Sequence, residues 1–470
     1  MSSCRFLLLA LALALASSSK AQPQAPGPIA DAETLRHFQA LVKINTIDPG
    51  SEKPLVDYLK EVLEAEGIEV KTFAKEPGRP NLVARLRGSG KKRPLLMMGH
   101  ADTASIDPSK WTFPAFSAAR DSGYVYGRGT IDDKDNVTAG LMTLLTLKRR
   151  KVPLDRDVIF MSEAGEEGSM QVGILHMAND NFPAIDAEYC FAEGANGIRT
   201  DGQLRFITVQ TTEKVPRQVD LVAKGASGHA SIPLPTNPVV HLATAIGKIG
   251  AWKPEIRLNS TSRAYFERMA AISPPALAAR YRAILSTDPK VVAETDEWFY
   301  ENEPRHSSML RTSVSPTMMN GGYRFNVIPS EARATLDVRA LPDEDPRAFL
   351  ESLRRLVNDP AVELKYTSPD TRPTSPPTRL DTEAFAAIEA AVKKEYGVLT
   401  VPMMGTSATD MAYLRAKGIQ CFGIGPVIDS EDGPKGFGAH SDQERIAEDE
   451  LYRFVRFQYA IIESLARAGR

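Results

Sequence analysis

Pro94–Met98 is an apolar run that leads directly into Gly99-His100-Ala101-Asp102. The run is short, apolar and without internal proline, as expected of a strand that is covered on both faces. Helical patterns alternate with this run and with others like it, which predicts an α/β fold with a mostly parallel sheet flanked by helices. The other runs of this kind are Val158–Met161, Tyr189–Phe191 and Gln420–Ile424.

The middle of the chain follows a different pattern. Its segments come in the order β-α-β-β-α-β, which predicts a small split, ferredoxin-like α+β sheet with helices on one face. We therefore expect an inserted domain, residues 214–367, between two halves of a larger domain, residues 31–213 and 368–470. Residues 253–308 are helix-prone and could extend the insertion. The predicted strands are Gln218–Ala223, Arg324–Ile328, Ala332–Val338 and Val362–Tyr366, and the predicted helices are His241–Ile249 and Pro346–Val357.

The N-terminus is typical of a secretory leader. Arg5 precedes the apolar run Phe6–Ala16, whose eleven residues fall short of the roughly 20 that span a bilayer. Ser19-Lys20-Ala21 is a small-x-small cleavage site, so residues 1–21 are predicted to be a signal peptide and residues 22–30 a tether. An uncleaved anchor is the alternative. The leader predicts a secreted or periplasmic protein without membrane contact after cleavage.

Composition places the chain among ordinary globular proteins. The 470 residues are 43% hydrophobic and 25% charged, with a formal net charge of -2. No basic field favours nucleic acid as a partner. Beyond the leader only Cys190 and Cys421 remain, and their spacing does not say whether they pair.

Acids and histidines fall where three predicted strands end. His100 follows the first run, Glu166 and Glu167 follow the second, and Glu193 follows the third. In open parallel sheets, sites form at the carboxyl ends of the strands. These side chains are therefore expected to meet at one edge of the sheet.

Two further segments offer ligands. Tyr126–Lys134 contains glycines that allow a tight turn, and it places Asp132 near the start of a helical pattern. Gly438–Glu444 contains His440. Asp133 competes with Asp132 as the ligand, and an aspartate here can also be only a helix N-cap. His440 by itself could be an ordinary loop histidine.

Together these residues suit a pair of zinc ions. Two such ions usually share one carboxylate, and each keeps an imidazole and a carboxylate of its own. Glu166 then stands beside the activated water as the base, and Asp102 can accept the other ring N–H of His100. Asp135, Glu163 and Glu444 are left without a chosen role. The predicted metal ligands are His100, Asp132, Glu167, Glu193 and His440.

The set of motifs resembles a family of cocatalytic two-zinc peptidases that includes aminoacylase, glutamate carboxypeptidase, carnosinase and succinyl-diaminopimelate desuccinylase. His-x-Asp, Gly-Arg-Gly-x-x-Asp-x-Lys, Glu-Glu-Gly, Glu-Gly and a final His occur in order over roughly residues 31–470. The resemblance implies a zinc-peptidase-like catalytic domain, a lid domain, and two zinc ions per chain that Co²⁺ or Mn²⁺ can replace. It implies that His100, Asp132 and Glu193 hold one ion, that Asp132, Glu167 and His440 hold the other, that Glu166 is general base and then general acid, and that the Asp132–Asp133 peptide is cis.

The resemblance also assigns roles outside the metal centre. His229 of Gly228–Pro233 would stabilise the oxyanion, often across a homodimer formed through the inserted domain. Asn326 and Arg339 would bind substrate, although Arg339 could instead pair with Asp337 or Glu331 on its strand. Gly405 and Thr406, with Thr409-Asp410, would line the pocket. One departure is Asp135-Asn136 after the motif lysine, which is expected to add negative charge near the site.

These residues favour zinc-dependent hydrolysis of an amide bond in small peptides or N-acyl amino acids. The activity would be that of a metallo-exopeptidase, either a carboxypeptidase or a dipeptidase. An N-acyl amino acid amidohydrolase (aminoacylase) or a desuccinylase is the alternative within the class. Outside the class, a catalytically dead metal- or peptide-binding protein and a structural-zinc protein remain open.

Overall fold

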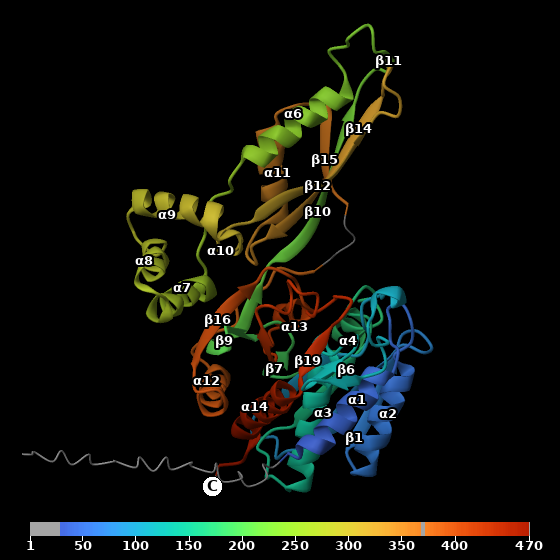
Figure 1. Ribbon diagram of the computed structural model, residues 1–470, viewed down its shortest axis with the longest axis vertical. Helices are drawn as coiled ribbons and strands as arrows, with labels where there is room; N and C mark the ends of the chain where they lie inside the picture. The colour runs from blue at the N-terminus through green and yellow to red at the C-terminus, as the bar shows by residue number, and fades with distance from the viewer. Residues whose placement is uncertain (1–28, 368–371, 470) are drawn as a thin grey trace, which may run out of the picture.

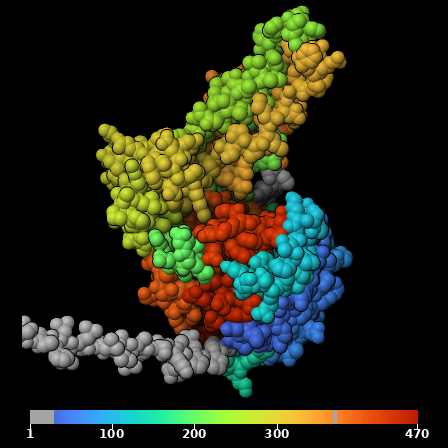
Figure 2. Space-filling model, viewed as in Figure 1, coloured from blue at the N-terminus to red at the C-terminus, as the bar shows by residue number. Residues whose placement is uncertain are grey.

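The chain forms a larger body and an elongated inserted domain that projects from it (Figures 1 and 2). This computed structural model describes residues 29–367 and 372–469. The predicted signal peptide, most of the tether and part of the return to the second half of the larger domain lie outside the described residues. Within the described part of the chain, no helix is long and apolar enough to cross a membrane.

One mixed sheet forms the centre of the larger body. Its strands are β1 (Glu69–Ala74), β2 (Pro80–Leu86), β3 (Leu95–His100), β6 (Val158–Glu163), β7 (Tyr189–Ala192), β8 (Gly197–Thr200), β9 (Gln203–Glu213), β16 (Leu399–Gly405), β17 (Gln420–Gly423) and β18 (Val427–Asp429). They lie in the order β1-β2-β6-β3-β7-β17-β9-β8-β18, with β16 beside β9. The middle strands β6, β3, β7 and β17 are parallel.

Helices cover both faces of this sheet, which confirms the predicted fold class. Leu95 and Met97 of β3 pack into the cluster on one face, whereas Leu96 and Met98 pack into the cluster on the other. Because side chains alternate along a strand, a strand buried on both faces must be apolar at every position. The first face is covered by α1 (Asp31–Lys43), α2 (Lys53–Ala65), α3 (Lys134–Arg149), α12 (Glu383–Glu395) and α14 (Glu448–Ala466), and the second by α4 (Ile174–Asp180), α5 (Phe182–Ile185) and α13 (Met411–Ala416).

A small sheet and two cysteines complete the larger body. The strands β4 (Ala119–Asp121), β5 (Tyr124–Tyr126) and β19 (Arg445–Ala447) pair in the order β19-β5-β4, and η1 (Pro108–Lys110) precedes them. This sheet joins segments that are more than 300 residues apart, since Arg445 is opposite Tyr126.

Cys190 and Cys421 lie opposite each other on β7 and β17, and both are buried free thiols.

The inserted domain is an antiparallel sheet covered by helices. Its strands are β10 (Val215–Lys224), β12 (Ser313–Gly321), β14 (Glu331–Ala340) and β15 (Val362–Tyr366), in the order β12-β14-β10-β15. α6 (Pro238–Ala251) and α11 (Pro346–Val357) pack with this sheet in one apolar cluster. The alternating strand residues Val219, Leu221 and Ala223 point into that cluster.

The sequence missed one strand of this domain. The segment predicted at Arg324–Ile328 is only β13 (Val327–Ile328), and it pairs with β11 (Gly228–His229) rather than with β14. The partner of β14 is β12, an exposed edge strand whose register shifts at Pro316. An edge strand with an exposed face and a proline lacks the apolar alternation by which strands are recognised.

Residues 253–308 form a helical unit between the two bodies (Figure 1, yellow-green and yellow). It consists of α7 (Ser260–Ile272), α8 (Pro275–Ala283), α9 (Pro289–Asn302) and α10 (Pro304–Met309). Its core contains Phe266, Tyr281 and Phe299, and the same cluster includes Val401 and Met403 of β16. The unit therefore packs on the sheet of the larger body.

The close approach of α3 to β3 at Gly99 generates a stability prediction. A Cβ at Gly99 would lie 2.8 Å from the backbone N of Val137, so Gly99→Ala must push the first turn of α3 away. We expect a free energy of unfolding lower by about 1–3 kcal/mol, measured by urea denaturation of metal-free protein. Gly247→Ala is the control, because no atom lies within 4 Å of its Cβ on α6, and it should raise stability by about 0.5–1 kcal/mol. Equal shifts in both variants would contradict this reading of Gly99.

Candidate metal centre

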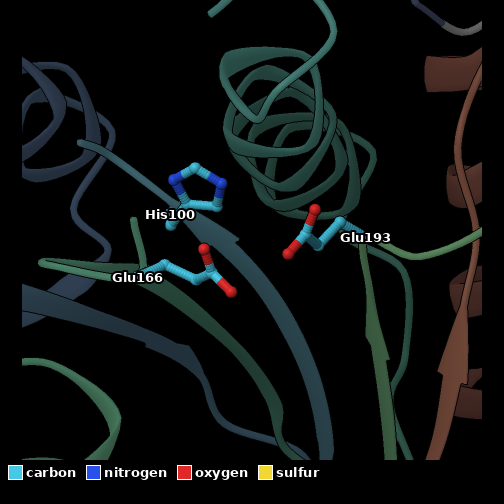
Figure 3. A group of neighbouring side chains, drawn as sticks. All are labelled: His100, Glu166 and Glu193. Carbon is cyan, nitrogen blue, oxygen red and sulfur yellow. The ribbon is translucent and has the colours of Figure 1, made fainter. Parts of the chain in front are cut away.

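Three neighbouring parallel strands bring the first predicted site residues to one edge of the sheet. His100 is the last residue of β3, Glu193 follows β7 directly, and Glu166 stands on the turn after β6. Ligand atoms of these three side chains lie within 4.8 Å of one another. Figure 3 shows the two carboxylates and the imidazole converging from separate strands.

Two loops bring Asp132 and His440 to the same edge. His100 Nε2 lies 3.0 Å from Asp132 Oδ1, and His440 Nε2 lies 3.1 Å from Asp132 Oδ2. His440 Nε2 is also 3.0 Å from Glu167 Oε1. The Asp132 carboxylate thus stands between the two imidazoles, each facing a different oxygen.

All five predicted ligands therefore surround one small volume. Besides the group with Glu166 and Glu193, His100 forms a second potential metal-binding group with Asp132 and Glu167. Imidazole nitrogens with carboxylate oxygens are a donor set that zinc-like ions prefer. The arrangement, with a shared central carboxylate and one imidazole on each side, fits a pair of ions.

The electrostatics of the site favour cations. Burial and neighbouring acids raise the pKa values of Glu166 and Glu193 well above their usual range. Hydrogen bonds with Asp132 and Glu167 raise the pKa of His440 to about 10. A protonated imidazole compensates part of this negative charge, and metal ions would take over that compensation.

The two candidate aspartates of the bridging position differ in what they contact. Asp132 faces both imidazoles, whereas Asp133 turns back into the protein. Asp133 Oδ2 accepts the backbone N–H of His100 at 3.1 Å, and Oδ1 accepts the side-chain amide of Asn136 at 2.6 Å. The Asp132–Asp133 peptide is cis, as the resemblance implies.

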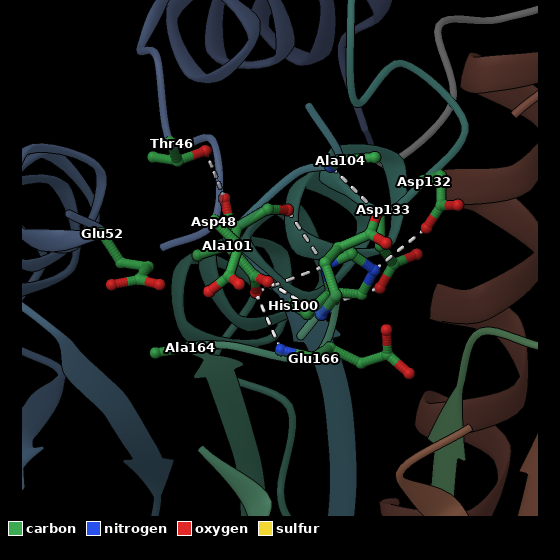
Figure 4. A network of polar contacts seen from close by, with 12 residues as sticks. Thr46, Asp48, Glu52, His100, Ala101, Ala104, Asp132, Asp133, Ala164 and Glu166 are labelled. Carbon is green, nitrogen blue, oxygen red and sulfur yellow. Dashed lines mark hydrogen bonds and ion pairs between the residues drawn. The ribbon is translucent and has the colours of Figure 1, made fainter. Parts of the chain in front are cut away.

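Asp102 contacts the backbone of the acidic turn as well as the His100 ring that the sequence predicts. His100 Nδ1 lies 3.0 Å from the backbone oxygen of Asp102 and 3.5 Å from its carboxylate. The carboxylate oxygens accept the backbone N–H groups of Glu166 and Glu167 at 3.1 and 2.9 Å. Asp102 therefore fixes the imidazole and the acidic turn relative to each other. Figure 4 shows His100, Asp132 and Glu166 within this network of polar contacts.

A buried ion pair, which the sequence left open, links the two loops of the site. Arg128 Nη1 donates to Glu444 Oε2 at 2.5 Å, and neither side chain is more than 2% exposed. Glu444 Oε1 accepts the backbone N–H of Ile131 at 2.9 Å. Ile131 precedes Asp132, and Glu444 follows His440 by four residues. This ion pair therefore fixes the loop of Asp132 relative to the loop of His440.

Asp135 differs from its neighbours in the site by its burial. It is fully buried on α3, and desolvation raises the pKa of its carboxyl well above the usual range. Burial therefore opposes the negative charge that the sequence predicts at this position.

The structure does not bring the lid residues His229 and Asn326 to the metal centre. They lie side by side at the far tip of the inserted domain, where the backbone N–H of Ala230 donates to Asn326 O. His229 Nδ1 accepts the backbone N–H of Ser231 at 3.1 Å. A neutral His229 must then carry its proton on Nε2, which makes that nitrogen a donor.

The other predicted substrate residues lie nearer to the larger body. Arg339 stands at the root of the lid, opposite Pro216 at the start of β10. It pairs with Asp337 on its own strand through Nε and Nη2, at 2.7 and 3.0 Å. Gly405 ends β16 at the edge where β9 crosses into the lid, and Thr406 follows it.

Three polar residues lie behind Glu166, and sequence reasoning missed one of them, Arg372. Arg372 and Asp410 are buried beside it, and Glu163 is buried at the end of β6. Arg372 lies in a proline-rich connection without helical or strand pattern, so no local signal distinguishes it. Only the three-dimensional structure places it near the site.

Comparison with known proteins yields many similar chains. The sequence pattern of peptidase family M20/M25/M40 matches residues 96–464. A probable carboxypeptidase S-like protein 2 of Dictyostelium discoideum is 24% identical over 93% of this chain and 86% of its own length. Aminoacylase-1 of Mus musculus is 24% identical over 93% of this chain and 97% of its own length. An N-fatty-acyl-amino acid synthase/hydrolase of Homo sapiens is 25% identical over 79% of this chain and 74% of its own length.

Solved structures share the fold. A metallo-carboxypeptidase of this family from Sulfolobus solfataricus has a TM-score of 0.68 at 21% identity and covers 92% of this chain and 98% of its own. A dinuclear metal-binding peptidase from Bacillus subtilis has a TM-score of 0.59 at 16% identity, with coverage of 92% and 98%. Since the family pattern spans most of the chain and includes all the converging side chains, this protein belongs to peptidase family M20/M25/M40.

Proposed function

We propose that this protein is a two-zinc hydrolase that cleaves an amide bond next to a free carboxylate, in small peptides or N-acyl amino acids. The observation that carries the proposal is the convergence of His100, Asp132, Glu167, Glu193 and His440 around one volume with Glu166 at its side. Co²⁺ or Mn²⁺ would suit the same donors.

Glu166 is the residue for proton transfer in this proposal. Zinc ions held by His100, Asp132, Glu167, Glu193 and His440 would supply Lewis-acid chemistry, which polarises a carbonyl and lowers the pKa of a water to about 7. Glu166 accepts the proton of the attacking water and donates it to the leaving nitrogen. Its carboxyl sits beside His100 and Glu193, and its raised pKa suits a group that must hold a proton between these steps.

His229 would stabilise the oxyanion from a partner subunit. Its Nε2 is a donor in the neutral tautomer, but it lies away from the metal centre of its own chain. The edge strand β12 and exposed apolar residues on the lid support a homodimer through this domain. These residues are Ile232, Val240, Met318, Met319, Tyr323 and Phe325.

Arg339 and Asn326 would position the substrate. Arg339 offers a planar fork that suits a carboxylate, and at 37% side-chain exposure it can exchange Asp337 for a substrate. Asn326 would reach the site together with His229, because the two share the lid tip. Gly405 and Thr406 would line the pocket from the end of β16.

Two substrate classes compete within the proposal. The leader, residues 1–21, supports a secreted or periplasmic enzyme that acts on peptides, as a carboxypeptidase or dipeptidase. The similarity to aminoacylase-1 and to an N-fatty-acyl-amino acid synthase/hydrolase favours N-acyl amino acids. Purified mature protein, assayed on dipeptides and N-acyl amino acids with and without a chelator, separates the two.

The first functional prediction concerns Glu166. Glu166→Gln should lower kcat roughly 10²–10⁴-fold, while metal analysis still finds two ions per chain, because the side chain transfers protons rather than ligating. Glu188→Gln is the matched control, since Glu188 lies at the amino ends of the strands. Normal turnover in the Glu166 variant would exclude it as the base.

The second prediction is that zinc affinity depends on pH. His440 has a pKa of about 10 without metal, so it is protonated at neutral pH, and zinc must displace that proton. Below about pH 10 the affinity should fall roughly tenfold per pH unit for each proton displaced. Calorimetry in buffers of different ionisation enthalpy measures the number of protons released when zinc binds. His440→Ala should release fewer protons. An affinity independent of pH would contradict the assignment.

The third prediction tests whether His229 acts across a dimer. Glu166→Gln and His229→Ala should each be inactive, and a refolded equal mixture should recover about one quarter of wild-type activity. The recovered site combines Glu166 of one subunit with the other subunit's His229. If His229 serves its own chain, the mixture stays inactive.

A further inference from the structure

Arg372 occupies a buried position beside the proposed general base. It lies between β15 and α12, on the return from the lid to the larger body, and its side chain is 9% exposed. Arg372 Nη2 lies 3.9 Å from Glu166 Oε1 and 3.5 Å from Asp410 Oδ1. It also donates to Met170 Sδ at 3.3 Å.

The surroundings of Arg372 are strongly acidic. Glu163 comes from the end of β6, Glu166 from the turn after it, and Asp410 from the residue before α13. Burial raises the pKa of Asp410 to about 6, and the charge of Arg372 opposes that rise. Like charges at such short range repel, and the Arg372 guanidinium is a cation within reach of both Glu166 and Asp410.

The frame around Arg372 is anchored on both sides. The loop that carries Asp410 is fixed by Glu213, whose carboxylate accepts the N–H and the hydroxyl of Thr409 at 3.0 and 2.8 Å. On the other side, Arg217 of β10 donates to the backbone oxygen of Arg372 at 2.6 Å. The guanidinium therefore has a defined place between the lid root and the pocket loop.

The distance to Glu166 determines what Arg372 can do. At 3.9 Å the contact is too long for a hydrogen bond, but the charges still attract each other in a desolvated site. The guanidinium thus orients the carboxylate without occupying the lone pair that must accept a proton. A direct bidentate pair would instead compete with proton transfer.

We infer that Arg372 is a positioning residue that holds the Glu166 carboxylate in its reactive orientation, an inference that rests on the proposed role of Glu166 as the base. The two zinc ligand groups do not include Arg372, so its removal should leave metal binding intact. The substrate carboxylate is assigned to Arg339, so its removal should also leave substrate affinity largely unchanged.

The test compares Arg372→Met and Arg372→Lys in the metal-loaded enzyme. We expect Arg372→Met to lower kcat about tenfold or more, with KM within about twofold and two metal ions per chain. Arg372→Lys should retain more turnover, because it keeps a cation near Glu166. Arg156→Met is the matched control: Arg156 is also buried and ion-paired, but at the opposite edge of the sheet with Glu188 and Glu383. It should lose stability without losing kcat.

Two results would overturn the inference. One is an unchanged kcat in Arg372→Met, and the other is a loss seen only as a raised KM, which would make Arg372 a substrate ligand. A double-mutant cycle with Glu166→Asp adds a direct readout: if Arg372 acts through Glu166, its removal costs less in that background than in wild type. Glu166→Gln is assayed in parallel to separate a failure of this inference from a failure of the proposed function. Full activity of Glu166→Gln would refute the role of Glu166 as the base.

Discussion

The structure depends on the compensation of negative charge at one edge of a sheet. Asp132, Glu166, Glu167 and Glu193 meet there around His100, largely removed from water. Isolated buried carboxylates are too costly to leave charged, so this arrangement requires cations at its centre. Metal ions satisfy that requirement and supply a Lewis acid at the same point. The cations that compensate the negative charge are therefore also the cations that the hydrolysis needs.

The fold stabilises this concentration of charge through buried contacts that fix the segments carrying His100, Asp132, Glu167 and His440. Asp102 accepts the N–H groups of the acidic turn, and the Arg128–Glu444 pair ties the Asp132 and His440 loops together. These contacts are buried and hydrogen-bonded at both ends, which is the condition under which buried charge stabilises a geometry. Arg372 extends the same principle to Glu166, at a distance that leaves the carboxylate free to react.

The inserted domain carries predicted site residues at both of its ends. Its root carries Arg339 and joins the frame around Arg372, while its tip carries His229 and Asn326 away from the centre. The helical unit of residues 253–308 packs on β16, next to the strand that leads into the lid. The helical unit is therefore packed on the larger body beside the strand from which the lid begins.

The sequence by itself determined the α/β class and the convergence of site residues. Apolar runs ending in His100, Glu166 and Glu193 require parallel strands buried on both faces, and such strands must share a carboxyl edge. The remaining features depend on contacts between segments that are distant in the chain. These contacts distinguish Asp132 from Asp133, bury Asp135, pair the edge strand β12 with β14, and place Arg372 beside Glu166. Periodicity records which face of an element is buried, but contacts and pKa shifts arise between segments that are distant in the chain, and no local pattern encodes them.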